Sequence, residues 1–117
     1  MYTNTDMTLY KKEYDATTKK EKWIRHEIRR VFWDNAQGAN IIKSGMSTAN
    51  SVTVFIPLGH ISVEPKTGDY IVRGIIQEEF TKITDLTKNY ADAHVLTTVD
   101  KKDFGSKHMQ HYELGGR

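Results

Sequence analysis

The chain contains no cysteine, and this absence removes three kinds of chemistry at once. Disulfide bonds, thiolate nucleophiles and cysteine-ligated metal sites are excluded, and an intracellular folding compartment fits. Apolar runs are also short, a few residues from Val54 to Leu58, where a membrane-spanning helix needs roughly 20. The first residues, 1–6, have neither a basic nor an apolar stretch and predict no signal peptide.

A strong charge of either sign is missing too. The chain has 17 Lys and Arg against 15 Asp and Glu, so its formal net charge is +2, which does not by itself imply a polyanionic partner. The 117 residues suffice for one modest core. We therefore expect a single domain over residues 1–117, with flexible ends near residues 1–6 and 115–117.

The centre of the chain carries the clearest structural signal. Residues 52–56 alternate in the period of two that is typical of a half-buried strand, and Pro57 ends the run. A turn over residues 65–69 leads into a second β-branched run at residues 70–72, which Gly74 closes. Two strands with sharp boundaries are predicted here.

The flanking segments extend the β pattern. Residues 22–33 favour a strand with a bulge near Arg29 or Arg30, although two interleaved helical stripes also fit. Residues 84–90 predict a helix of one to two turns with Thr84 as its N-cap. Further strands are predicted at residues 7–14, 94–99 and 107–114. Residues 39–43 are expected to form a short strand or a packed loop. Residues 44–50 are expected to form a wide connection and residues 100–105 a turn. The predicted fold is mainly β: a small barrel or sandwich of about six strands with one short helix.

Five histidines invite a metal hypothesis. His108 and His111 would align on a helix but lie on opposite faces of the predicted strand, and the other histidines are isolated. No cluster supplies the three or four ligands of a zinc site. Paired carboxylates occur only as neighbours or in a turn, at Glu78, Glu79, Asp100 and Asp103. We therefore predict no catalytic residue, no metal and no cofactor; an enzyme that uses His108 and His111 is the weakest alternative.

One region has an excess of basic charge. From Lys11 to Arg30, eight Lys and Arg face four Asp and Glu. Aromatic residues are interleaved with them: Tyr10, Tyr14, Trp23 and Trp33. Cations that follow a backbone and rings that stack on bases are the pattern of a barrel binding single-stranded nucleic acid. This function, through a hairpin over residues 11–33, stays open beside the simpler interpretation of a solvated hairpin with core tryptophans.

Short pieces along nearly the whole chain carry a resemblance. They are Met1–Asn4 with Met7–Tyr10, Val31–Trp33, the run from Gly45 to Pro57, Gly68–Gly74, Thr84–Leu86, Val99–Asp100, Gly105–Ser106, Met109 with His111, and Gly115–Arg117. Together they resemble a group of small structural proteins from tailed bacteriophages of Gram-positive hosts, similar in size and strand pattern to β-barrel head-closure and adaptor proteins.

The resemblance implies a virion protein at the head–tail junction that is assembled in the host cytoplasm and acts by forming a ring. The implied partners are copies of itself and portal, adaptor or tail proteins, with transient contact to packaged DNA and none to a membrane. Loops and termini are the expected contact regions, at residues 34–38 and 44–50 and at both ends. The candidate contact residues are Tyr2, Asn35, Gln37, Ser47, Asn50, His111 and Arg117.

Overall fold

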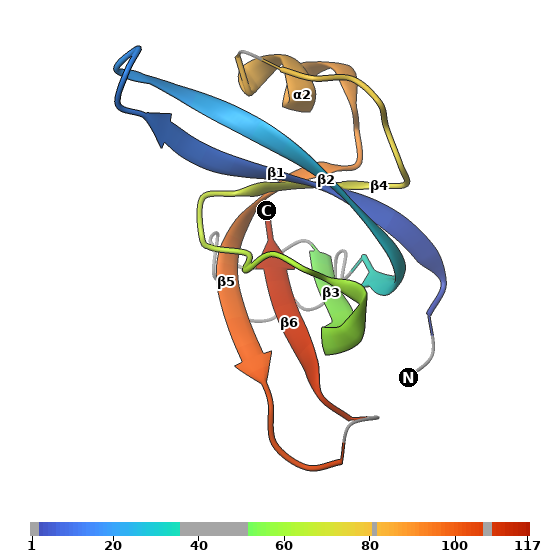
Figure 1. Ribbon diagram of the computed structural model, residues 1–117. Helices are drawn as coiled ribbons and strands as arrows, with labels where there is room; N and C mark the ends of the chain where they lie inside the picture. Colours follow the sequence, from blue (N-terminus) through green and yellow to red (C-terminus); the bar gives the residue numbers. More distant parts are fainter. Residues whose placement is uncertain (1–2, 36–51, 81, 107–108) are drawn as a thin grey trace, which may run out of the picture.

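Antiparallel strands close into a small barrel (Figure 1). The computed structural model describes residues 3–35, 52–80, 82–106 and 109–117. The strands follow each other around the barrel in the order β1-β2-β3-β6-β5-β4. Their bounds are β1 Thr5–Asp15, β2 Lys20–Asp34, β3 Val52–Pro57, β4 Tyr70–Arg73, β5 Ala93–Lys102 and β6 His111–Gly116, with a 3₁₀ turn η1 Leu58–His60 and a helix α2 Thr84–Asn89. The predicted mainly β fold with one short α-helix is confirmed.

Alternating side chains from all six strands fill the barrel. In β3, Val52, Val54 and Ile56 are fully buried, while the side chains between them are partly exposed. The same inward face of the other strands contributes the rest of this core: Met7, Leu9, Ile28, Val31, Trp33, Ile71, Leu96, Tyr112 and Leu114. Each fully buried aliphatic side chain contributes about 1.5–3 kcal/mol by leaving water, so this layer holds the barrel together.

A second, smaller core lies on the outside of the barrel. The connection from β4 to β5 packs Phe80 and Leu86 against Tyr10 and Val72. The rings of Tyr10 and Phe80 meet edge to face, with centroids 5.4 Å apart. The six-residue helix α2 buries one side chain, Leu86, in this cluster. Because packing on the barrel supplies what so short a helix lacks in local stability, α2 forms without a side-chain cap.

The N-terminus of α2 corrects one prediction. Its N-cap is Ile83, with no side-chain cap hydrogen bond, and Thr84 is already helical. The carbonyl of Thr84 instead accepts a hydrogen bond of 3.1 Å from the hydroxyl of Thr87. A hydroxyl caps only from the residue before the first helical turn, so the start one residue earlier than expected removes that role from Thr84.

The bulge predicted in the second strand is confirmed. Thr5 pairs with Val31 and Met7 pairs with Ile28, so one residue of β1 faces two of β2 between these pairs. Arg30, one of those two, has φ of 62°. Its backbone N–H donates to Asp6 Oδ1 over 2.9 Å. The carboxylate thus replaces the ladder partner that the bulge removes.

The C-terminal residues are part of the barrel and not a loose end. Gly115 and Gly116 pair with β3 on one side and β5 on the other. The backbone of Arg117 exchanges two hydrogen bonds with Val95, of 3.0 and 3.2 Å. Any side chain at Gly116 would lie 3.0 Å from Val52 Cγ1. The absence of a side chain at these positions allows close strand packing. The prediction of a flexible end near residues 115–117 is therefore wrong.

Other boundaries shift as well. At the start of the chain, Asn4 exchanges side-chain hydrogen bonds of 3.0 and 2.8 Å with the backbone of Trp33, so residues 4–6 are held against β2. The predicted turn at residues 100–105 begins later, because β5 continues to Lys102. The last strand begins at His111 rather than residue 107.

The predictions for residues 39–43 and 44–50 lie outside the described residues. No helix in the described part of the chain is both long and apolar enough to cross a bilayer.

Candidate functional site

The hairpin of β1 and β2 projects beyond the barrel wall. Strand β1 pairs with β4 only from Met7 to Tyr10, and β2 pairs with β3 only from Phe32 to Asp34. The two strands nevertheless pair with each other as far as Asp15 and Lys20. The outer half of the hairpin is therefore a two-stranded ribbon, seen at the upper left of Figure 1.

Asp69 fixes the point at which this ribbon leaves the barrel. Its side chain is buried and accepts backbone N–H bonds from Lys12 over 3.2 Å and from Lys66 over 2.9 Å. The ammonium of Lys11 lies 3.4 Å from the same carboxylate. Because backbone pairing of β1 to β4 ends at Tyr70, Asp69 takes over as the acceptor for β1, and three donors satisfy its buried charge.

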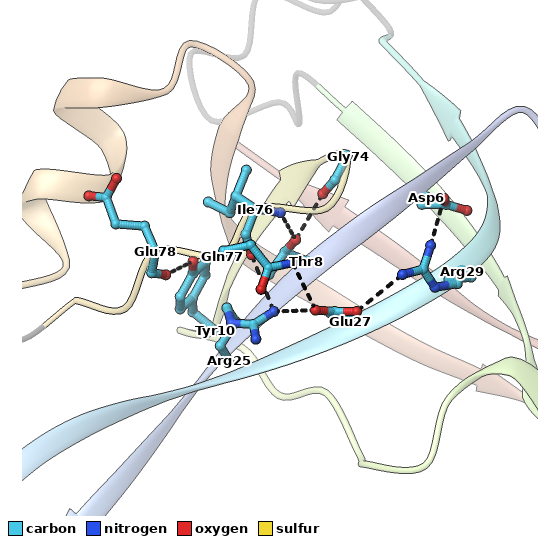
Figure 2. A network of polar contacts seen from close by, with 10 residues as sticks. All are labelled: Asp6, Thr8, Tyr10, Arg25, Glu27, Arg29, Gly74, Ile76, Gln77 and Glu78. Carbon is cyan, nitrogen blue, oxygen red and sulfur yellow. Dashed lines mark hydrogen bonds and ion pairs between the residues drawn. The ribbon is translucent and has the colours of Figure 1, made fainter.

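Side chains of the hairpin hold the segment that follows β4 (Figure 2). The hydroxyl of Thr8 donates to the Gly74 carbonyl over 2.8 Å and accepts from the Ile76 N–H over 3.0 Å. The guanidinium of Arg25 donates to the Ile76 carbonyl over 3.2 Å, and the hydroxyl of Tyr10 donates to the Glu78 carbonyl. Gly74, Ile76 and Glu78, every second residue of the segment, are thus hydrogen-bonded by side chains of β1 and β2. In a sheet, backbone groups of a neighbouring strand would make such bonds.

A chain of charges supports this arrangement. Glu27 accepts from Arg25 over 2.7 Å and from Arg29 over 3.2 Å, and Arg29 also lies 3.6 Å from Asp6. The hydrogen bond from Arg25 lowers the pKa of Glu27. Burial raises the pKa of Tyr10 to about 12, so its hydroxyl keeps its proton and stays a donor. The segment after β4 therefore has a fixed position beside β2.

A groove lies between that segment and the ribbon. One wall consists of consecutive residues of β2, from Lys20 to Arg25, and the other of Glu79, Phe80 and Lys82, around a volume of about 610 Å³. Trp23 lies in the β2 wall and packs its ring edge-on against Tyr70, with centroids 5.5 Å apart. A wall made of consecutive strand residues presents a strand edge, with backbone and side chains alternating along it.

The turn between β5 and β6 forms a second projection, at the bottom of Figure 1. Phe104 is 72% exposed and Met109 is 67% exposed. They line a shallow depression with Lys102, Gly105, His111 and Glu113. Tyr14, in the ribbon, is 66% exposed. All the large apolar side chains that stand exposed in the described residues thus lie on the two hairpins, and such exposure marks contact surfaces when it is clustered.

The structure places three of the sequence-predicted contact residues. Asn35 follows β2 and accepts a hydrogen bond of 2.9 Å from the Trp33 indole. Arg117 follows β6 at the same end of the barrel, because Asp34 and Gly115 both pair with Thr53. His111 begins β6 at the opposite end, about 20 Å away at the usual rise per strand residue. Tyr2, Gln37, Ser47 and Asn50 lie outside the described residues.

Sequence reasoning missed the exposed apolar residues. Phe104 lies between Asp103 and Gly105, in a turn, and turns usually consist of small and polar residues. An aromatic residue in a turn between polar residues does not reach the core, so the sequence of this turn could have predicted an exposed ring. His111 is the one predicted residue in that depression, where its ring Nδ1 lies 2.7 Å from the Met109 carbonyl and its ring packs against Phe55.

The aromatic residues proposed to stack on bases are largely committed to the fold. Tyr10 and Trp33 are buried, and Trp23 packs on Tyr70. Several of the basic groups face carboxylates: Lys11 with Asp69, Lys12 with Glu21, Arg25 with Glu27 and Arg29 with Asp6. A stacking platform needs several exposed rings beside uncommitted cations, and of the four proposed rings only Tyr14, at 66%, is largely exposed.

No metal centre is built in the described part of the chain, where no three His, Asp or Glu side chains gather into a ligand group. His111 is described and His108 is not, so the pair that motivated an enzyme cannot be read as a site.

The fold and its surfaces define a small closed β-barrel whose exposed apolar side chains are carried on two projecting hairpins. A family model, DUF6751, described as a family of unknown function, matches residues 2–117, and the chain belongs to this family. Comparison with curated proteins and with solved structures gives no match.

Proposed function

We propose that the protein is a virion structural protein of a tailed bacteriophage, a ring subunit at the head–tail junction that acts by assembly and without catalysis. Its partners are copies of itself and neighbouring portal, adaptor or tail proteins, with transient contact to packaged DNA. It is assembled in the host cytoplasm and is retained in the particle. The observation that carries the proposal is the concentration of exposed apolar side chains on two separate hairpins.

Two separate surfaces are what a ring subunit needs. In a closed ring each subunit offers one patch to the neighbour before it and a different patch to the neighbour after it. The β1–β2 ribbon and the β5–β6 turn project at different ends of the molecule (Figure 1). A barrel with these two projections fits a head-to-tail contact better than a two-fold symmetric dimer, which uses one patch twice.

The chain-wide resemblance to small phage structural proteins gives independent support. Its pieces include residues 52–57 and 68–74, which form β3, β4 and the turn before β4. Others fall at the two projections, including Met7–Tyr10 at the base of the ribbon and Met109 with His111 beside the β5–β6 turn. The resemblance therefore covers the barrel, the base of the ribbon and the side of the β5–β6 turn, and none of its pieces falls between Tyr10 and Val31.

Mass spectrometry of purified particles tests the proposal directly. We expect the chain in tailed virions at a fixed ratio to the portal protein, and we expect deletion of its gene to give filled heads without joined tails. Normal tailed particles from the deletion strain, or particles that lack the chain, would reject the proposal.

A further inference from the structure

In the described residues, the outer edge of strand β2 is paired over only part of its length. Its inner edge pairs with β1 along nearly the whole length, but on the outer edge pairing with β3 begins only at Phe32. Among the described residues, no strand pairs with the outer edge from Lys20 to Arg30; near its end the His60 ring lies 3.0 Å from the Arg30 carbonyl. An open edge of this length is a template for the addition of another strand.

Strand β5 has a second open edge. Pairing with β4 runs from Ala93 to Val95, and two further backbone bonds join Leu96 to Gly68 and Asp69. From Thr98 to Lys102 this edge has no backbone partner in the ranges that the structure describes, whereas the opposite edge pairs with β6. The described residues therefore leave an open edge on β2 and another on β5, carried on different hairpins, beside a shorter unpaired stretch of β1 from Glu13 to Asp15.

We propose that the contact between ring subunits is an antiparallel pairing of these two edges, Thr98–Lys102 of one copy with Lys20–Ile24 of the next. The inference rests on the proposed function, because it specifies the contact that a ring requires. It joins two different patches, so a copy that has used one of its edges keeps the other edge for its second neighbour. Addition to a strand edge supplies affinity through main-chain hydrogen bonds.

Side-chain charges single out a register for this pairing. One antiparallel alignment brings together three complementary cross-strand pairs: Val99 with Trp23, Asp100 with Lys22, and Lys101 with Glu21. Opposite charges and aromatic–β-branched pairs directly across an antiparallel ladder are the favourable combinations. At the end of this alignment Lys102 meets Lys20, a repulsion that limits assembly of the free protein.

The groove beside β2 gives the incoming strand room. It follows the edge from Lys20 to Arg25, and its far wall contributes Phe80. An antiparallel strand that enters here carries its following turn, with Phe104, towards the tip of the ribbon. Tyr14 is exposed near that tip, in register with Glu21. The pairing therefore brings Phe104 of one copy to the ribbon tip that carries the exposed Tyr14 of the next.

Because the chain has no cysteine, single-cysteine variants test the contact without background. Full-length Lys22→Cys and Asp100→Cys proteins carrying tags of different mass are mixed at high concentration and treated with a short bismaleimide, which removes the geometric demands of a disulfide. We expect mixed dimers to exceed the random ratio to like dimers by about threefold, a size that the two pairs left after the cysteine changes, Val99 with Trp23 and Lys101 with Glu21, can supply. The matched control mixes Asp100→Cys with Lys88→Cys, an exposed position on α2, and gives the random ratio.

A charge reversal in the same assay tests the register. Adding Lys101→Glu to the Asp100→Cys protein sets two carboxylates opposite each other and lowers the mixed-dimer yield by about two- to fivefold. Adding Glu21→Lys to the Lys22→Cys protein restores the yield. A random ratio in the first mixture, a dominance of like dimers, or cross-linking of the Lys22→Cys variant to a different protein in particles overturns the proposed pairing. The purified mixture reports on the pairing even if virions lack the chain, so the two proposals fail separately.

Discussion

The hydroxyl of Tyr10 donates a hydrogen bond to the backbone carbonyl of Glu78, across 68 residues of sequence. This bond joins β1, at the base of the projecting ribbon, to the segment that leads into the other wall of the groove. With the bonds from Thr8 and Arg25, it sets the distance between the two walls, because after the backbone bond from Gly74 to Asp6 the segment has no strand pairing in the described residues. The groove is therefore held by side chains of β1 and β2 at the base of the ribbon.

Replacing Tyr10 with Phe keeps the ring contact with Phe80 and removes this hydrogen bond. We expect a loss of about 1 kcal/mol in the free energy of unfolding, the usual contribution of one such bond, seen as a lower midpoint in urea. Tyr14→Phe, an exposed change on the same strand, is the control and leaves the midpoint unchanged. An unaltered midpoint for Tyr10→Phe would show that the bond does not hold the segment.

The raised pKa of Tyr10 also predicts behaviour in alkali. The folded protein holds the phenolic proton up to about pH 12, whereas an unfolded tyrosine loses it near pH 10. Folding stability that this group contributes is complete below pH 10 and is lost between about pH 10 and 12. The stability of Tyr10→Phe should thus fall less steeply in that window, measured by urea unfolding at each pH. If stability falls equally steeply with pH in both proteins between pH 10 and 12, Tyr10 does not hold its proton in the way described.

In acid the carboxylate of Glu27 is the informative group. Its pKa is lowered, first by the hydrogen bond from Arg25, so the folded state favours the ionised form. The stability from this ion pair is present above about pH 4.3, the ordinary glutamate pKa, and disappears as the pH falls through the lowered folded value. Glu27→Gln should be less stable than the natural protein at pH 7 and equal to it at low pH. Glu64→Gln, an exposed change outside the network, controls for the loss of one carboxylate.

Gly116 tests the packing of the C-terminal strand. A methyl group there would lie 3.0 Å from Val52 Cγ1, 3.1 Å from His94 Cβ and 3.3 Å from the Val95 carbonyl. We expect Gly116→Ala to destabilise the barrel by about 1–3 kcal/mol, the cost of overpacking a core. Gly59→Ala is the matched control, since no atom lies within 4 Å of its new methyl group. Equal midpoints in thermal unfolding would mean that β6 moves aside at no cost.

The strands could be predicted because their side chains alternate. Residues 52–57 and 70–73 are runs rich in β-branched residues with turn residues beside them. At the bulge, β2 has one residue more than β1, and Arg30 is one of the two residues that face a single partner. The role of Gly115 and Gly116 could not be predicted, because a glycine that allows close strand packing and a glycine in a loose end look the same in sequence. Only the pairing of β6 with both of its neighbours distinguishes them.

The candidate surfaces were predictable only in part. His111 is one of the predicted contact residues, and it lines the depression beside Phe104. Phe104 and Met109 themselves were overlooked, since their exposure depends on where the β5–β6 turn stands relative to the barrel. The open edges of β2 and β5 depend on which strands pair for how long, a property of the register that no single strand reveals.

The assembly state of the isolated protein follows from these surfaces. The exposed apolar side chains are few and divided between two hairpins, and the β2 edge carries lysines at Lys20 and Lys22. Lysine on an open edge opposes unwanted pairing, so we expect a monomer or a weak oligomer in solution and a ring of many copies only on the assembled particle. Light scattering at micromolar concentration measures the first, and images of the particle neck measure the second. A stable closed ring of the purified protein would show that assembly needs no template, because the edges alone would then overcome the repulsion between Lys102 and Lys20.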